Sequence, residues 1–174
     1  MALAVCLMFD ARTDLAMRQL WTRVEELGVP TLMTHTHGRH HPHLSYAVLR
    51  RWKLAEVQQA VTMLPDAGPI QLHLDGVGLF RRGRCWLIPA VTSGLAARQE
   101  RVVAAVESTG AELHRHYRPG LWVPHCTLAP RVPLAAMRDV VAAVYDVLPM
   151  RAQVDRAALI DSATGQVWPL PHVP

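Results

Sequence analysis

The chain has 174 residues, of which 51% are hydrophobic and 18% are charged, a composition that excludes a disordered protein and suits one domain or two small lobes with a shared core. Its formal net charge of +4 favours anionic partners. The basic residues form neither a Lys/Arg-rich tail nor a dense stripe, which argues against a long nucleic-acid-binding groove.

The first half of the chain alternates between the patterns of strands and of amphipathic helices. Apolar residues recur at helical spacing between 12 and 27, and Gly28 supplies a helix stop. The predicted elements, in chain order, are a strand at 2–9, a helix at 12–27, an extended segment at 29–36, a polar loop through Pro42, a strand at 43–49 and a helix at 54–64 that ends before Pro65.

The second half repeats this alternation. The turn at 81–84 predicts a hairpin, and Ser93 is a suitable N-cap for the helix that follows it. The predicted elements are strands at 70–80 and 85–91, a helix at 93–109, a loop at 110–120, a strand at 121–128, a helix at 134–148, and closing strands at 151–161 and 166–170 around the turn Thr164-Gly165.

This order has no dominant parallel β-α-β repeat, so it predicts an α+β fold with helices outside antiparallel sheets. The strands at 43–49 and 121–128 occupy comparable places in the two halves of the chain. We therefore expect a single domain over 1–174, built from two interleaved, pseudo-symmetric lobes whose sheets line a central cleft.

Cys6, Cys85 and Cys126 lie in apolar runs without the spacing of a metal or redox motif, which favours reduced cysteines in a cytoplasmic protein. The apolar start of the chain lacks a basic segment, so it predicts a core strand rather than a signal peptide. No apolar run approaches the roughly 20 residues that a membrane span needs, and no membrane partner is expected.

One short pattern occurs twice, as Pro-His-Leu-Ser-Tyr at 42–46 and as Pro-His-Cys-Thr-Leu at 124–128. In a strand, side chains at i and i+2 point to the same face. Each histidine would therefore share a face with the hydroxyl side chain two residues later. A single His-x-Ser/Thr triplet is weak evidence in a chain with ten histidines, but the shared proline, apolar flanks and strand context make the pair informative.

Histidine can donate or accept a proton near neutral pH. Cleavage of a phosphodiester needs a base for the attacking hydroxyl or water and an acid for the departing oxygen. We expect His43 and His125 to supply these two groups without a metal, in an order that the sequence does not reveal. The hydroxyls of Ser45 and Thr127 would bind the non-bridging phosphate oxygens.

The double motif resembles that of the 2H phosphoesterase superfamily, which includes the 2′-5′ RNA ligase-like proteins and cyclic nucleotide phosphodiesterases. That family is defined by two His-x-Thr/Ser motifs with apolar flanks. The segment at 121–129 is similar to its second motif, and 78–89 is similar to its mid-chain hairpin. Ser45 stands where threonine is commoner, and the hydroxyl is kept. The resemblance implies the same roles for His43, Ser45, His125 and Thr127.

Residues near the two motifs are candidates for holding the substrate. Tyr117 and Trp122 precede the second motif, and an exposed ring there could stack on a base. Arg39, Arg118 and Arg131 lie in loops beside the motifs and could meet a phosphate. For each of the five, ordinary packing or a solvated surface position is the alternative.

Two other classes of function compete with this reading. The five histidines between 35 and 43, with His114 and His116, could form a metal site, although no His-Glu-x-x-His pattern or suitably spaced carboxylate accompanies them. A non-catalytic RNA- or nucleotide-binding module would keep the cleft without turnover. A dinucleotide-binding or P-loop enzyme is disfavoured, because Gly76-Val77-Gly78 lacks the third glycine and no Gly-Lys-Ser/Thr occurs.

The function expected from the sequence is metal-independent cleavage of a 2′,3′-cyclic phosphate or a 2′-5′ linked ribonucleotide, with 2′-5′ RNA ligation as the reverse reaction. No cofactor is expected. The expected partner is a small nucleotide or RNA terminus that carries a phosphodiester or cyclic phosphate, and the protein is expected to be a monomer.

Overall fold

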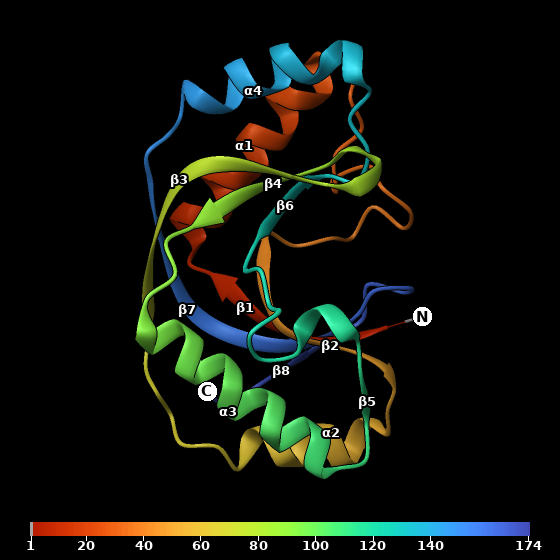
Figure 1. Ribbon diagram of the computed structural model, residues 1–174, viewed down its shortest axis with the longest axis vertical. Helices are drawn as coiled ribbons and strands as arrows, with labels where there is room; N and C mark the ends of the chain where they lie inside the picture. The colour runs from red at the N-terminus through yellow and green to blue at the C-terminus, as the bar shows by residue number, and fades with distance from the viewer. Residues whose placement is uncertain (1) are drawn as a thin grey trace.

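The computed structural model describes residues 2–174 as one antiparallel sheet flanked by α-helices (Figure 1). The strands are β1 (Leu3–Phe9), β2 (His43–Arg51), β3 (Ile70–Phe80), β4 (Arg84–Pro89), β5 (Glu112–Leu113), β6 (Cys126–Ala129), β7 (Met150–Asp161) and β8 (Val167–Pro169). The α-helices are α1 (Ala11–Glu26), α2 (Leu54–Thr62), α3 (Ser93–Ser108) and α4 (Met137–Tyr145), and 3-10 turns η1 (Arg81–Gly83), η2 (Arg115–Tyr117) and η3 (Leu134–Ala136) connect them.

The strands follow the order β5-β2-β1-β7-β3-β4-β6, and β8 pairs with β7. Every pairing is antiparallel. The antiparallel arrangement and the helices outside it are confirmed, and the strands of both halves belong to one hydrogen-bonded set that is joined through β7. Val154 marks the junction, since it pairs with Phe9 of β1 and with Ile70 of β3.

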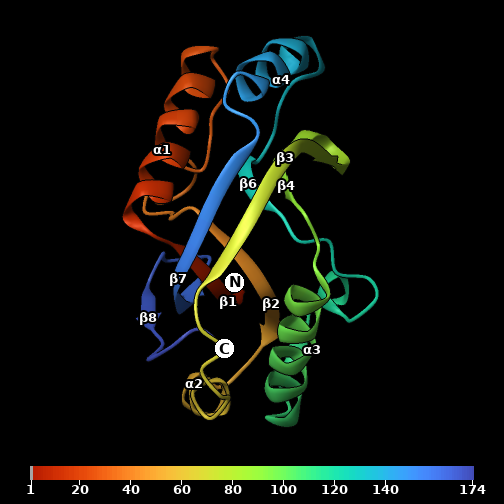
Figure 2. The ribbon, with the colours of Figure 1, turned by 90° about the vertical axis from the view of Figure 1, so that its left-hand side faces the viewer.

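The helices cover the two ends of this sheet. Helices α1 and α4 pack together at one end, and α2 and α3 pack together at the other (Figures 1 and 2). Asp10 caps α1 by accepting a hydrogen bond from the Thr13 backbone N–H at 2.8 Å. For α3 the N-cap is Thr92, one residue before the predicted Ser93.

Each helix buries an apolar face, as the spacing of its apolar residues predicts. For α1 these residues are Met17, Leu20, Trp21 and Val24. Among the described residues, none of the helices combines the length and apolar character that a bilayer-spanning helix needs.

The predicted extended segment at 29–36 is wrong, because the structure has turns there. The Glu25 carboxylate accepts hydrogen bonds from Thr31 N–H and from the hydroxyls of Thr31 and Thr34, at 3.1, 2.7 and 2.7 Å. These bonds hold the chain in a compact loop. The loop still touches the sheet edge, since Leu32 N–H donates to the Leu128 carbonyl at 3.1 Å.

The predicted strand at 121–128 is also shorter than expected, since β6 begins only at Cys126. Pro124 has no N–H to donate to a neighbouring strand, which explains why regular pairing starts after it. The loop predicted at 110–120 contains the two-residue strand β5 and the turn η2. His125 therefore immediately precedes β6 and is not part of the strand.

Candidate active site

The two motif histidines occupy equivalent positions at the starts of two strands. His43 is the first residue of β2, and His125 immediately precedes β6. In each, ring Nδ1 lies 2.7 Å from the carbonyl oxygen two residues earlier, that of His41 or of Val123. A carbonyl can only accept, so Nδ1 carries the proton in both rings. Each neutral imidazole therefore keeps the lone pair of Nε2 available.

Burial lowers the pKa of both histidines below the ordinary value. For His43, the hydrogen bond to the His41 carbonyl acts in the opposite direction, and the charge of His125 lowers the pKa further. For His125, the additional lowering comes from the Arg84 guanidinium. The Trp122 indole, three residues before His125, donates to the Ser45 carbonyl at 3.1 Å, so the fold brings the two distant motif segments together.

The two hydroxyls differ in their surroundings. Ser45 is 8% exposed, and its Oγ lies 3.6 Å from the buried Cys6 Sγ. The Tyr117 hydroxyl is also close, since a hydrogen-bonding contact with Ser45 partly offsets the burial that raises the pKa of Tyr117. Thr127 is more accessible and lies on the surface of a cleft. The first motif therefore presents a well-packed hydroxyl, and the second presents an open one.

That cleft, hereafter the motif cleft, has a volume of about 710 Å³ and is lined by His125, Thr127 and Tyr117. His43 and Ser45 are not among its lining residues. Among the described residues that form its wall, none is an Asp or Glu. Besides His125, the basic side chains of the wall are Arg81, Arg82, Arg84, Arg115, His35, His114 and His116. Such a wall favours an anionic ligand.

An aromatic pair supports His125 on one side. Phe80 and Trp86 stack with ring centroids 4.7 Å apart, and His125 meets them edge-on at 5.0 and 5.7 Å. Gly78 makes this packing possible, because a Cβ at that position would collide with the indole of Trp86. The β3–β4 hairpin thus determines both the ring packing and the charge around His125.

The predicted binding residues lie in different places. Tyr117 lines the motif cleft, with its ring centroid 6.5 Å from that of His125. The Trp122 indole instead donates to the Ser45 carbonyl at 3.1 Å and packs against Tyr46, so that it braces the first motif strand. Trp122 is not among the residues that line the motif cleft.

The three predicted arginines are also separated. Arg39 donates to the Thr164 carbonyl at 2.7 Å, and Arg118 is exposed; neither lines the motif cleft. Arg131 lines a neighbouring cavity of about 720 Å³. Sequence reasoning missed Arg84, whose charge reaches His125. The sequence feature that could have indicated Arg84 is the arginine-rich turn at 81–84, in the hairpin between the two motifs.

The histidine-rich loop forms an imidazole cluster. The ring centroids of His37 and His40 are 4.2 Å apart, and those of His35 and His40 are 5.9 Å apart. Burial and neighbouring imidazoles lower the pKa of His40 to about 4. Within residues 2–174, no group of three or more His, Cys, Asp or Glu side chains is arranged to hold a metal ion.

Comparison with known proteins identifies the family. The model of the 2′-5′ RNA ligase superfamily matches residues 16–166, and the chain belongs to that superfamily. The resemblance to 2H phosphoesterases is thus confirmed, and the family supports phosphoesterase activity in general. No curated protein matched the chain.

Solved structures share the fold at low sequence identity. A protein described as a phosphoesterase superposes with a TM-score of 0.61 at 17% identity, covering 97% of this chain and 94% of its own. LigT of E. coli, complexed with NADP+, gives 0.58 at 17% identity, with coverage of 97% and 93%. Usb1 of Kluyveromyces marxianus, with uridine monophosphate, gives 0.54 at 14% identity, with coverage of 98% and 97%.

Proposed function

We propose that this protein is a phosphodiesterase that cleaves 2′,3′-cyclic phosphates or 2′-5′ linked ribonucleotides by acid–base catalysis with His43 and His125. The observation that carries the proposal is the matched pair of Nδ1 hydrogen bonds, 2.7 Å each, which orient two imidazoles alike and leave both Nε2 atoms free. Family membership and the nucleotides bound by LigT and Usb1 support the substrate class.

In the proposed reaction, one imidazole removes a proton from water or a ribose hydroxyl as the oxygen forms a bond to phosphorus. The other imidazole, protonated, donates its proton to the ribose oxygen as the P–O bond breaks. The two histidines have then exchanged protonation states. When the attacking group is the neighbouring ribose 3′-hydroxyl, the products are a 2′,3′-cyclic phosphate and a free 5′-hydroxyl, and the same residues serve the reverse of that step, 2′-5′ ligation. Because the two imidazoles supply both proton transfers, we propose that the reaction needs no metal.

Ser45 and Thr127 would donate to the non-bridging oxygens, where negative charge grows as phosphorus becomes five-coordinate. We also assign Arg84 to this step, because its charge already acts on His125 and its partner strand β3 fixes its position. Tyr117 is proposed to contact the nucleotide, since it lines the motif cleft. Binding roles for Trp122, Arg39 and Arg118 stay predictions.

The proposed substrate is a small nucleotide or an RNA terminus. We further propose that the protein is a monomer of the cytoplasm, where its three free, buried cysteines would remain reduced.

The test is turnover of 2′,3′-cyclic nucleotides and 2′-5′ dinucleotides by the wild type and by the His43→Ala and His125→Ala variants. We expect each variant to lose about 10²–10⁴-fold in kcat while still binding nucleotide. His73→Ala is the matched control, because His73 is exposed on β3, and it should retain full activity. Unchanged turnover in either motif variant contradicts the proposal, and affinity changes without any turnover in the wild type indicate a binding module.

Excess chelator tests the metal-independence directly. Activity of the wild type should be the same with and without EDTA. Loss of activity in EDTA, followed by recovery with zinc, would replace the two-histidine mechanism with a metal-dependent one.

A further inference from the structure

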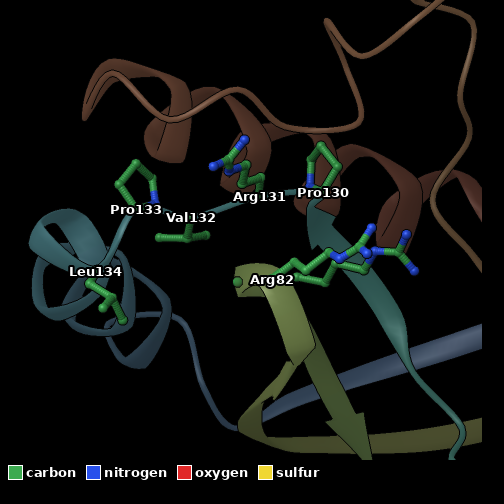
Figure 3. A pocket seen from close by; sticks show the side chains of 8 residues that line it. Arg82, Pro130, Arg131, Val132, Pro133 and Leu134 are labelled. Atoms are coloured by element: carbon green, nitrogen blue, oxygen red, sulfur yellow. The ribbon is translucent and has the colours of Figure 1, made fainter.

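A second cavity, of about 720 Å³, lies next to the motif cleft (Figure 3). It is bounded on one side by the β3–β4 turn and on the other by residues 130–134, which connect β6 to η3. The two hollows share Arg82, Arg84 and Pro130 in their walls. A ligand that fills the motif cleft can therefore continue into this second cavity past the same two arginines.

The second cavity is cationic and otherwise apolar. Arg82, Arg84 and Arg131 are among its lining residues, together with Leu134, which is 90% exposed. None of its lining side chains, all within the described residues, is acidic. These arginines take part in none of the ion pairs found among residues 2–174. Their charges are therefore available to an anionic ligand.

The shared wall is held in place by the backbone. Val132 N–H donates to the Gly83 carbonyl at 2.7 Å, which fixes the β3–β4 turn against the segment after β6. Gly83 has a φ of +73°, and a Cβ there would collide with the Val132 carbonyl oxygen. Arg82 adopts a φ of 69°, in the left-handed region that non-glycine residues avoid. The turn thus presents Arg82 and Arg84 from a preformed wall.

The combined volume of the motif cleft and the second cavity is larger than one mononucleotide would fill. A pocket for a small ligand has a volume of roughly 300–1,000 Å³. The motif cleft alone, at about 710 Å³, reaches that range, and the second cavity adds a comparable volume with its own cations. A ligand with a second phosphate beyond the reacting one matches this arrangement.

We propose that the second cavity binds a backbone phosphate of an oligoribonucleotide whose terminal phosphate lies in the motif cleft, so that the preferred substrate is an RNA end rather than a mononucleotide. This inference rests on the proposed function for the position of the terminal phosphate. Arg131 and Arg82 bind the additional phosphate, and the apolar side chains of the cavity contact the adjoining nucleoside.

Calorimetry with ligands that cannot turn over tests this proposal without requiring catalysis. The ligands are uridine 3′-phosphate and a 3′-5′ linked uridine trinucleotide that ends in a 3′-phosphate. We expect the trinucleotide to bind roughly 10- to 100-fold more tightly, as one or two charge-assisted hydrogen bonds would give. Its affinity should also fall more steeply with salt, by about 0.7 in logarithmic slope for each additional phosphate neutralised on a single strand.

Two variants locate the effect. Arg131→Gln should remove most of the trinucleotide's advantage over the mononucleotide and should reduce the salt slope by about 0.7. Leu134→Glu should do the same, because it places a carboxylate at the edge of the cavity, at a position that is 90% exposed and where folding is not disturbed. Met63→Glu is the control for the change in charge, since Met63 is 77% exposed at the end of α2, at the opposite end of the molecule (Figure 1).

The outcomes separate this inference from the proposed function. A trinucleotide that binds no more tightly than uridine 3′-phosphate, or an advantage that survives in Leu134→Glu, overturns the second phosphate site. Arg131-dependent binding of ADP-ribose without any advantage for the trinucleotide would contradict an RNA substrate in favour of a pyrophosphate ligand. If the wild type cleaves no diester yet shows the variant-sensitive advantage, the proposed function fails and the RNA-binding site stands.

Discussion

At the scale of single residues, Arg84 links the β3–β4 hairpin to the chemistry of the second motif. Burial is the main cause of the lowered pKa of His125 and of His114, and the Arg84 guanidinium lowers both pKa values further; at Tyr117 the same charge opposes the rise in pKa that burial causes. A positive charge in this place has two opposite consequences for catalysis. It destabilises the imidazolium form of His125, and it attracts the phosphate on which His125 acts.

Replacing Arg84 separates these two consequences. In Arg84→Gln, the pKa of His125 should rise toward its ordinary value, because the neighbouring positive charge is gone. The limb of the pH profile of kcat/KM that His125 governs should therefore move to higher pH. The value of kcat/KM at the optimum should fall about 10- to 100-fold, as expected for a lost charge-assisted contact with phosphate. The checks are the pH profile and an NMR titration of the His125 ring.

Lys53→Gln removes one positive charge at the N-cap of α2 and serves as the control. Its pH profile should overlay that of the wild type. A His125 titration in Arg84→Gln that moves to lower pH, or does not move, would show that Arg84 does not act on this imidazole.

At the scale of elements, the sequence predicts best what short-range patterns determine. The motif strand β2 begins at the predicted residue, His43, and the hairpin turn between β3 and β4 lies where its glycine and arginines indicate. The prediction of an extended segment at 29–36 is wrong because Glu25, in the preceding helix α1, accepts hydrogen bonds from Thr31 in that segment. The pattern of polar and apolar residues within 29–36 contains no information about the Glu25 carboxylate.

In the candidate site, too, some residues could be predicted from the sequence and others could not. Two histidines with their hydroxyls are visible in the sequence as a repeated pattern, whereas the arginines of the cleft wall come from the β3–β4 turn and from η2. Their convergence depends on the strand order, in which β4 lies between β3 and β6. Strand order is a property of tertiary packing, so the identity of the cationic wall became visible only in the fold.

The hairpin also shows how one glycine determines the wall of the cleft. Gly78 pairs with Trp86 across the hairpin, and its missing side chain leaves the space that the indole fills. Gly78→Ala should therefore push Trp86 toward His125 and reduce the free energy of unfolding by about 1–3 kcal/mol, the usual cost of overpacking. Urea denaturation measures the loss of stability, and kcat reports the displacement of His125.

Gly76→Ala is the matched comparison on the same strand. Its new Cβ would meet the Ile88 side chain, most closely the terminal Cδ1 atom at 3.2 Å and then Cβ and Cγ1 at 3.6 and 3.7 Å, and Ile88 is partly exposed and able to move. We expect the Gly76→Ala variant to lose little stability and no activity. Equal losses in the two variants would refute the specific role of the Gly78–Trp86 contact.

At the scale of the whole molecule, β7 connects the half of the sheet that carries the first motif to the half that carries the second. It pairs with β1 over most of its length and with β3 at its beginning. β1 in turn holds β2 with His43, and β3 holds β4 and then β6 next to His125. The relative position of the two imidazoles is therefore set by a continuous series of hydrogen-bonded strands. We propose on this basis that residues 1–174 fold as one domain of two interleaved lobes.

Val154 is the residue at which both halves meet, and it is fully buried. Val154→Ala should lower the free energy of unfolding by about 1–3 kcal/mol through the lost methyl groups and the cavity that they leave. If the two lobes form one cooperative unit, far-UV circular dichroism and tryptophan fluorescence should still report a single, coincident transition, displaced equally for both probes. Tryptophans report on both halves of the sheet, since Trp21 donates to the Thr127 carbonyl and Trp122 to that of Ser45. Two separated transitions in the variant would demonstrate that the lobes unfold independently and that β7 merely bridges two domains.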